Sequence, residues 1–133
     1  TTPGWYLMIV TATVEGRDIK YNVQFNEPNV WLMGSCIGDS SYGELNEAGK
    51  FEAPTTQNGD FVSPAFTGAC PGGDGDGVRV YVKIPGNDWW HSEFILDGDQ
   101  ISYRGTGGDQ TRLACAVGQK LYLNFSTGKG SLK

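Results

Sequence analysis

The sequence predicts an all-β protein folded as an antiparallel β-sandwich. Short stretches with period-two alternation of apolar and polar residues recur along the 133 residues, and few windows carry the 3.6-residue apolar stripe of a helix. Twenty glycines and six prolines interrupt the chain often. These breaks separate about nine short strands at near-regular spacing, which favours a sandwich over other all-β architectures. The length suits one domain with a sizeable core.

The N-terminal part predicts a hairpin and then a boundary. The strands are residues 5–14 and 18–25, with a turn at 15–17, and the second strand alternates cleanly enough to bury one face. A polar break at 26–29 follows. We expect residues 1–133 to be a single module. Residues 1–29 are either the tail of a preceding module or part of this one, and residues 30–133 are the module proper.

The next segments are short strands joined by long loops. Residues 30–34 are nearly all apolar, which predicts a strand buried on both faces, and an irregular loop follows at 35–48. Residues 50–54 and 59–66 read as strands with prolines near their ends, which suits sheet edges. A glycine-rich loop follows at 67–77. After the central hairpin come a strand at 101–104, a second glycine-rich loop at 105–110, and strands at 112–117 and 120–125.

The central feature is a hairpin over residues 78–96. In its first arm the apolar positions Val78, Val80, Val82 and Ile84 alternate with Arg79, Tyr81 and Lys83. Pro85 and Gly86 predict the turn, because proline fixes φ and glycine accepts a positive φ. In the second arm Trp90 shares a face with Phe94 and Leu96, so Trp90 is expected inward and Trp89 outward. A bulge after Asp88 would reverse that assignment.

Charge and cysteine content restrict the function classes. The net charge of −5 and a pI near 4.7 argue against nucleic acid. No apolar run is long enough to span a bilayer, and because the first residue is not Met we expect a mature form or an excised piece. Three cysteines, Cys36, Cys70 and Cys115, allow at most one internal disulfide, and their spacing does not suit zinc. Burial as small apolar residues is the simpler interpretation.

No motif predicts catalysis, a metal or a cofactor. The single histidine, His91, comes without a Gly-x-Ser-x-Gly turn, so a nucleophilic triad is not indicated. Four carboxylates near the hairpin could serve glycoside hydrolysis, but most lie in turns: Asp88, Glu93, Asp97 and Asp99. The stretch 73–77 lacks the ligand spacing of a calcium loop, and 105–108 is not a phosphate loop.

The aromatic residues around the hairpin turn suggest sugar binding. Tryptophan and tyrosine rings stack on the C–H faces of sugars, while amide, Lys and Arg groups bond the hydroxyl edges. The candidate glycan-binding residues are Trp89, Trp90, Lys83, Asn87, Tyr42 and Arg104. The alternative is that both tryptophans belong to the core. Two adjacent residues on a strand point to opposite faces, however, so one of them should be at least partly exposed.

Several of these stretches resemble a known family, the surface glycan-binding lipoproteins of the SusE and SusF type from starch-utilisation systems of Bacteroidetes. The similar stretches are residues 30–35, the strand ending at Lys83, the turn at 87–90 and residues 118–125. Residues 30–133 resemble one repeat of this family. Trp89, Trp90 and Lys83 match its binding motif best, and Tyr42 lies in a loop where the family often has a tryptophan.

The resemblance implies a fold, a function and a location. It implies an immunoglobulin-like β-sandwich that is a non-catalytic carbohydrate-binding module, with starch-like α-glucan as the ligand. It also implies exposure at the surface of the outer membrane, held by a lipid anchor outside this chain and beside an outer-membrane transporter. The main alternative is a spacer module that makes protein contacts within a surface transport complex, and a hydrolase ranks third.

Overall fold

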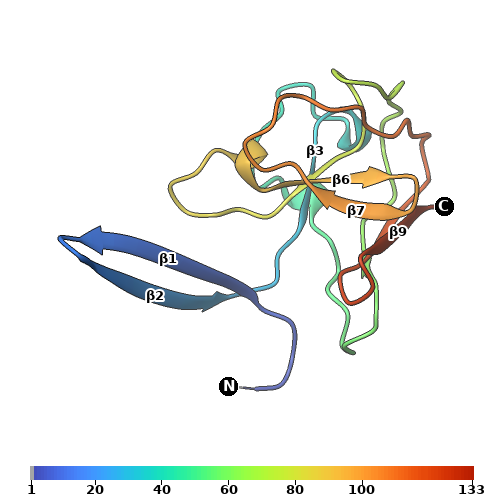
Figure 1. The fold of residues 1–133 in the computed structure, drawn as a ribbon. Coiled ribbons are helices and arrows are strands. Elements are labelled where there is room, and N and C mark those ends of the chain that lie inside the picture. The colour runs from blue at the N-terminus through green and yellow to red at the C-terminus, as the bar shows by residue number, and fades with distance from the viewer. Residues whose placement is uncertain (1) are drawn as a thin grey trace.

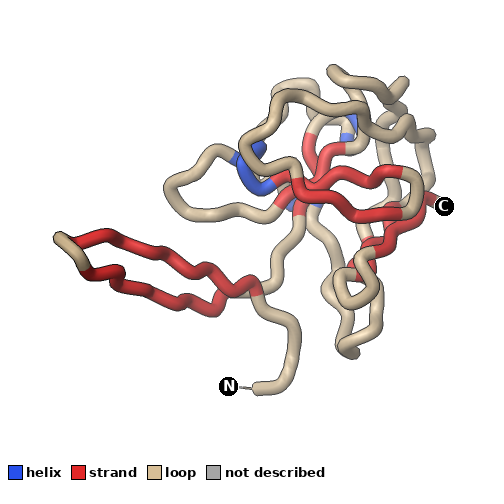
Figure 2. The backbone as a smooth tube through the Cα atoms, viewed as in Figure 1, coloured by secondary structure: helices blue, strands red, loops and turns tan. Residues whose placement is uncertain are grey.

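The computed structural model describes residues 2–133, and every strand pairing in this range is antiparallel (Figures 1 and 2). The strands are β1 (Leu7–Glu15), β2 (Asp18–Asn26), β3 (Trp31–Met33), β4 (Phe61–Val62), β5 (Arg79–Tyr81), β6 (Glu93–Asp97), β7 (Gln100–Tyr103), β8 (Leu121–Asn124) and β9 (Lys129–Leu132). Three 3₁₀ turns accompany them: η1 (Ser35–Ile37), η2 (Glu47–Gly49) and η3 (Trp89–Ser92). The prediction of an all-β antiparallel fold is confirmed.

Seven strands form one curled sheet in the order β3-β5-β6-β7-β9-β8-β4. Its two edges are closed by residues 50–52, which bridge to Trp31 on one side and to Val62 on the other. The N–H of Phe51 also donates to the carbonyl of Val30 at 2.9 Å. The expected edge strand at 50–54 is therefore reduced to bridges that pair with both edges, which leaves neither edge fully open.

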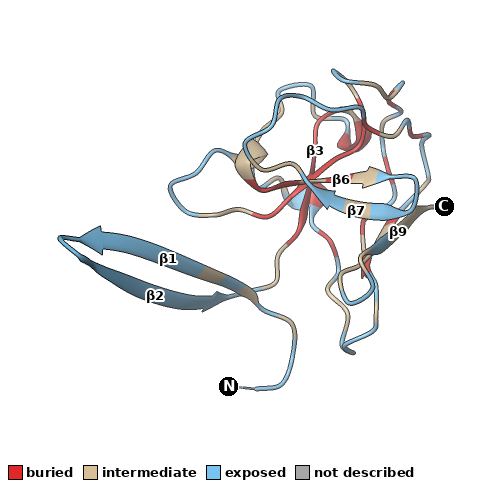
Figure 3. Cartoon of the chain, viewed as in Figure 1, coloured by how far each residue is buried: buried red, intermediate tan, exposed pale blue. Residues whose placement is uncertain are grey.

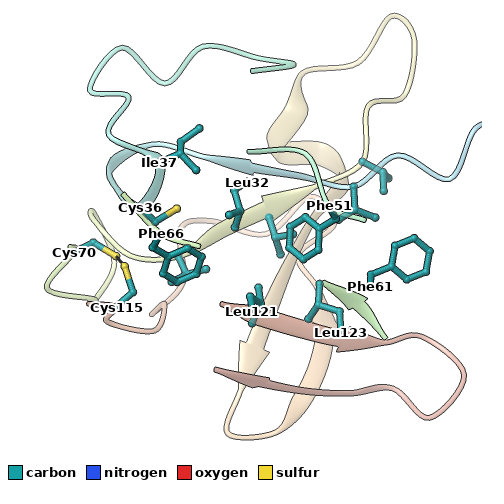
Figure 4. Close-up of a cluster of buried hydrophobic side chains, with 14 residues drawn as sticks. Leu32, Cys36, Ile37, Phe51, Phe61, Phe66, Cys70, Cys115, Leu121 and Leu123 are labelled. Carbon is teal, nitrogen blue, oxygen red and sulfur yellow. Dashed lines mark hydrogen bonds between the residues drawn. The ribbon is translucent and has the colours of Figure 1, made fainter. Parts of the chain in front are cut away.

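The main core lies between the two ends of this curled sheet. Leu32 of β3 and Val80 of β5 share one buried cluster with Phe61 of β4 and with Leu121 and Leu123 of β8 (Figure 4). Burying each such side chain contributes about 1.5–3 kcal/mol. The three cysteines lie in the same cluster, as expected for small apolar residues.

Both faces of β3 and β5 are buried. Leu32 and Val80 face the main core, while Trp31, Met33 and Tyr81 form a second cluster on the opposite face. Burial of the 30–34 strand on both faces is confirmed. The alternation expected in the first hairpin arm is confirmed, because Val78, Val80 and Val82 belong to the main core and Tyr81 to the second cluster. Arg79 and Tyr81 are nevertheless buried, and a loop residue contacts the latter: the N–H of Leu45 donates to the Tyr81 hydroxyl at 2.7 Å.

The central hairpin turns where expected but its second arm begins differently. The N–H of Asn87 donates to the carbonyl of Ile84 at 3.1 Å, and Gly86 has φ 81°, so the turn at Pro85 and Gly86 is confirmed. Trp89 and Trp90 then lie on η3, and β6 starts only at Glu93. Since a 3₁₀ turn does not alternate, the expected inward Trp90 and outward Trp89 are both wrong, and each ring is half-buried.

Other strand boundaries also differ. The stretch 59–66 is a strand only at Phe61–Val62, and 112–117 makes isolated bridges at Arg112 and Cys115 instead of a strand. Strand β9 was not predicted, because its sequence KGSL shows no clear alternation.

The β1–β2 hairpin projects away from the rest of the molecule (Figures 1 and 3). The expectation of one packed face in its second strand is wrong, since all nine residues of β2 are exposed, Tyr21 by 68%. Just before the hairpin, Trp5 attaches to the body: its ring packs edge-on against Phe61 with centroids 5.4 Å apart, and its Nε1 donates to the carbonyl of Thr56 at 3.0 Å. Among the described residues, no helix has the length and hydrophobicity needed to span a membrane.

Candidate functional site

A shallow pocket of about 630 Å³, called here the Trp pocket, lies beside the central hairpin. Four of the six candidate residues line it: Tyr42, Trp89, Trp90 and Arg104. Residues that the sequence did not nominate complete the lining: Gly75, Arg79, Thr106, Gly107, Gly108 and Asp109. The pocket is therefore built from η3, from the 35–48 loop and from the two glycine-rich loops.

Both tryptophans line the pocket, and they lie next to each other on the 3₁₀ turn η3. A 3₁₀ turn advances three residues per turn, so adjacent side chains diverge by about 120°. The ring of Trp89 packs edge-on against Tyr81, with centroids 5.9 Å apart, and the ring of Trp90 lies against His91. η3 is anchored from below, because the hydroxyl of the buried Ser92 donates to the carbonyls of Val82 and Trp89. Both rings line the Trp pocket, and each has a second ring packed against it.

Each tryptophan has an arginine over its ring. The guanidinium carbon of Arg79 lies 5.5 Å from the Trp89 centroid, and that of Arg104 lies 5.2 Å from the Trp90 centroid. Such cation–π contacts fix both partners. Among the described residues, Nε of Arg79 is the one buried side-chain nitrogen or oxygen without a hydrogen-bond partner.

A fully buried carboxylate, Glu93, holds these arginines. It accepts from Arg79 Nη1 at 3.3 Å and from Arg104 Nη1 at 2.7 Å. Arg112 adds a bidentate pair, with Nε and Nη2 each 2.7 Å from a carboxylate oxygen. A charge with no exposed surface is tolerated only when it is paired in this way. Glu93 thus determines where the arginine side chains stand beneath the Trp pocket.

Asp109 is the exposed partner of the same arginines. Its side chain is 48% exposed, and its carboxylate lies 2.9 Å from Arg112 Nη2 and 3.4 Å from both Arg79 and Arg104. Partial burial acts to raise the pKa of this carboxyl. The hydrogen bond from Arg79 and the charges of the three arginines outweigh that effect, so the pKa lies below its ordinary value. Three guanidinium groups against two carboxylates leave the cluster with one net positive charge.

Two candidate residues lie outside the lining of the Trp pocket. Lys83 Nζ donates to the carbonyl of Asn87 at 2.9 Å and pairs with Glu44. The Asn87 side chain is exposed at the turn. Lys83 therefore ties the hairpin turn to the 35–48 loop. That loop also carries Tyr42, whose hydroxyl donates to Asp76 at 3.4 Å.

Arg79, Glu93 and Arg112 were missed because their positions gave no local signal. Alternation places Arg79 on an outer face, and nothing in the sequence pairs Glu93 with Arg112, nineteen residues away. The one available hint was the number of charged residues inside otherwise apolar strands, since buried charges require partners.

The carboxylates weighed for catalysis do not form a pair around the Trp pocket. Glu93 is fully engaged by arginines, and Asp99 binds Lys129 at 2.8 Å on another part of the sheet. The aspartates of 73–77 bond protein groups, since Asp74 accepts from the hydroxyl of Thr111 at 2.8 Å and Asp76 accepts from Tyr42. Within the described residues, no group of three or more His, Cys, Asp or Glu side chains is placed to hold a metal.

Comparison with known proteins gives consistent matches. The sequence model of a family described as SusF/SusE starch specific CBMs (carbohydrate-binding modules) matches residues 29–131. The outer membrane protein SusF of Bacteroides thetaiotaomicron is 41% identical over 133 residues, which is 98% of this chain and 25% of that protein. The crystal structure of SusF from the same organism superposes with a TM-score of 0.81 at 40% identity, covering 98% of this chain and 28% of that one.

These matches confirm the family resemblance and the fold class. The chain spans about a quarter of the length of the relative, so it corresponds to one part of such a protein. The prediction of a non-catalytic binding protein is confirmed too, because the family consists of carbohydrate-binding modules. The chain belongs to the SusF/SusE family of starch-specific carbohydrate-binding modules.

Proposed function

We propose that the Trp pocket binds starch-like α-glucan. The observation that carries this proposal is the pair of half-buried tryptophans that line the pocket from η3, each beside an arginine that Glu93 holds in place. They are adjacent on a 3₁₀ turn, which directs neighbouring side chains apart. An α-1,4-linked glucan curves, so neighbouring glucose units present their C–H faces in different directions. Rings that diverge fit such a chain better than coplanar rings would. Arginine N–H groups then suit the vicinal hydroxyls, because the planar guanidinium donates in parallel.

The proposed site comprises Trp89, Trp90, Tyr42 and Arg104, with Arg79 added. Lys83 and Asn87 support it from the hairpin turn, since their mutual hydrogen bond and the Lys83–Glu44 pair hold the 35–48 loop beside η3. A single shallow site of this kind is expected to bind with a Kd of roughly tens of micromolar to millimolar, about −6.5 to −4 kcal/mol.

Isothermal titration with a series of maltooligosaccharides tests the proposal. Binding should appear with α-1,4 chains and be much weaker with β-1,4 glucans of equal length. The double variant Trp89→Ala with Trp90→Ala should lose at least tenfold in affinity. Tyr21→Ala, which removes an exposed ring on the distant hairpin, is the matched control and should bind normally. Absence of binding across the whole glycan panel would refute the proposal.

We also propose that the chain works at the outer-membrane surface, because the SusF relative is an outer membrane protein. There it would hold polysaccharide beside a transporter before import, anchored by a lipid outside this chain. Surface labelling of intact cells that carry the full-length protein tests the location. Co-purification with the transporter tests the partner.

The alternative function, a spacer module that contacts other proteins, is favoured by the β1–β2 hairpin, whose apolar side chains are exposed. Substitution of the two tryptophans distinguishes the alternatives. Loss of glycan binding at an unchanged melting temperature supports binding. A chain that never binds glycan, and whose tryptophan variants unfold, supports the spacer.

Domain extent is a related proposal. Residues 1–133 form one module in which Trp5 attaches the N-terminal segment to the body, while residues 30–133 contain the family repeat. Limited proteolysis followed by mass spectrometry should show cleavage within the hairpin and a stable fragment that starts near residue 27. A stable fragment that starts well inside 30–133 would contradict this division.

A further inference from the structure

Cys70 and Cys115 face each other inside the core. Their sulfur atoms lie 2.8 Å apart, and both residues are buried (Figure 4). The sequence alone allowed one disulfide among three cysteines without fixing the pair. In the structure Cys36 makes a different contact, with its Sγ 3.6 Å from the carbonyl of Met33.

The backbone around the two sulfurs is paired as in a β-ladder. The N–H of Cys70 donates to the carbonyl of Cys115 at 3.1 Å, and the N–H of Cys115 donates back at 3.0 Å. Residues that exchange both hydrogen bonds in an antiparallel pair have Cα atoms about 5.5 Å apart. This separation lies within the range of about 4.4–6.8 Å found for disulfides. The backbone therefore needs no movement to accept a bond.

We propose that Cys70 and Cys115 form a disulfide that cross-links the glycine-rich loop at 67–77 to the segment at 112–117, while Cys36 stays a free thiol. This goes beyond glycan binding and does not depend on it. Three residues along each segment from the paired cysteines, Gly73 and Arg112 also exchange hydrogen bonds at 3.0 Å. The disulfide would thus hold the segment that contains Gly75 beside the segment that contains Thr106–Asp109 and Arg112.

The reaction is thiol–disulfide exchange with a disulfide donor, such as an oxidised dithiol protein of the exported compartment. The thiolate of one cysteine attacks the donor disulfide, forms a mixed disulfide and releases one donor thiol. The second cysteine then attacks the first cysteine's sulfur and releases the other donor thiol. The chain loses two protons and two electrons, and the donor gains them. Proteins exported to the cell surface pass through compartments where such donors operate.

The bond should form while the chain folds. Burial raises the pKa of the Cys70 thiol to about 12, with the Cys115 contact adding to the effect, and burial also raises the pKa of Cys115. Thiolate, the reactive form, is therefore scarce once both residues are enclosed. The same burial protects the finished bond against reduction until the protein opens.

Thiol counting tests this inference. The full chain is refolded with a mixture of oxidised and reduced glutathione, then alkylated in denaturant and weighed by mass spectrometry. We expect one alkyl group per chain, and three after prior reduction. Proteolytic mapping should find one cross-linked pair of peptides, containing Cys70 and Cys115. Three alkyl groups, a cross-link through Cys36, or attached glutathione on Cys70 or Cys115 would each overturn the proposal.

Variants provide the matched controls. Cys36→Ala should take up no alkyl group before reduction, whereas Cys115→Ala should take up two. Reduction should lower Tm by roughly 5–15 °C in the unaltered chain and in Cys36→Ala. It should leave Cys115→Ala unchanged. Glycan titration of the same samples is a separate readout, so absence of glycan binding would leave the thiol count interpretable.

Discussion

Glu93 is the residue on which the candidate site depends most. Its carboxylate meets all three arginines of the cluster and has no exposed surface. If one partner of such a group is removed, the remaining charges stay buried without compensation. The cationic floor of the Trp pocket and the stability of the sheet therefore depend on the same side chain.

Glu93→Gln keeps the shape of the side chain but leaves three buried guanidinium groups short of a negative charge. The free energy of unfolding, measured by urea denaturation, should fall by about 3–5 kcal/mol. Asp109→Asn is the control, because that carboxylate contacts the same arginines but is half-exposed. Its cost should be about 1 kcal/mol or less. Equal costs for the two variants would show that Glu93 is not the main partner of the arginines.

Asp109 should make stability dependent on pH in the acid range. Its folded-state pKa lies below that of the unfolded chain, which is about 3.9. Its contribution is thus fully present above the unfolded pKa and is lost as the pH falls through the folded pKa. The difference in unfolding free energy between the unaltered chain and Asp109→Asn should be constant from about pH 7 to 5 and should shrink below about pH 4. Asp18→Asn, on the exposed hairpin, controls for general loss of surface charge; a difference that grows on acidification would contradict the assignment.

At the scale of elements, the position of Tyr42 depends on the turn that follows β3. Gly34 has φ 88°, and a Cβ there would stand 2.5 Å from Cε1 of the Tyr42 ring. Tyr42 itself has a positive φ of 55°. Tyr42 can reach the Trp pocket in this position because Gly34, the residue just before the 35–48 loop, has no side chain.

Gly34→Ala should therefore displace Tyr42 as well as strain the backbone. We expect a loss of stability of about 1–3 kcal/mol, together with weaker glycan binding by titration. Gly118→Ala is a matched control, since Gly118 has φ 90° and open space around the new Cβ. It should incur the backbone strain alone and bind glycan normally. Equal binding by the two variants would remove Tyr42 from the proposed site.

The sequence predicted those elements whose signal is local. Alternation located β5, and proline followed by glycine located the hairpin turn. Where long-range contacts decide, local reasoning failed. Trp89 and Trp90 lie on η3 instead of on a strand, and 112–117 stays irregular because it pairs only through isolated bridges.

The candidate site was predictable to the same extent. Aromatic residues near a turn indicated a stacking surface, and Tyr42, Trp89, Trp90 and Arg104 do line one pocket. The arginine cluster was not predictable, because its members come from distant segments and meet only in the folded protein. A buried ion pair between distant segments produces no periodic pattern in the sequence.

At the scale of the molecule, the body and the hairpin differ in how they are stabilised. The body has a large buried core, whereas β1 and β2 hold together mainly through their mutual ladder. A two-stranded hairpin alone is marginally stable in water. Local openings of such a region cost little free energy.

Hydrogen exchange should divide the chain accordingly. Amides of β1 and β2 should exchange within seconds to minutes, while those of β3, β5 and β8 should be protected until the whole sheet opens. The Trp5 indole, bonded to Thr56, should exchange more slowly than the hairpin amides. Protection of the hairpin equal to that of β8 would show that it has a stabilising partner in solution.

The attachment at Trp5 has a mechanical consequence. Leu7 and Asn26 pair at the end of the hairpin nearest the body, so the hairpin carries no load while Trp5 holds. If tension at the N-terminus pulled Trp5 free, the ladder would open one residue pair at a time from that end. About twenty residues would then extend by roughly 60–70 Å. A pulling force on the N-terminus would therefore extend the hairpin before it acted on the sheet that carries the Trp pocket.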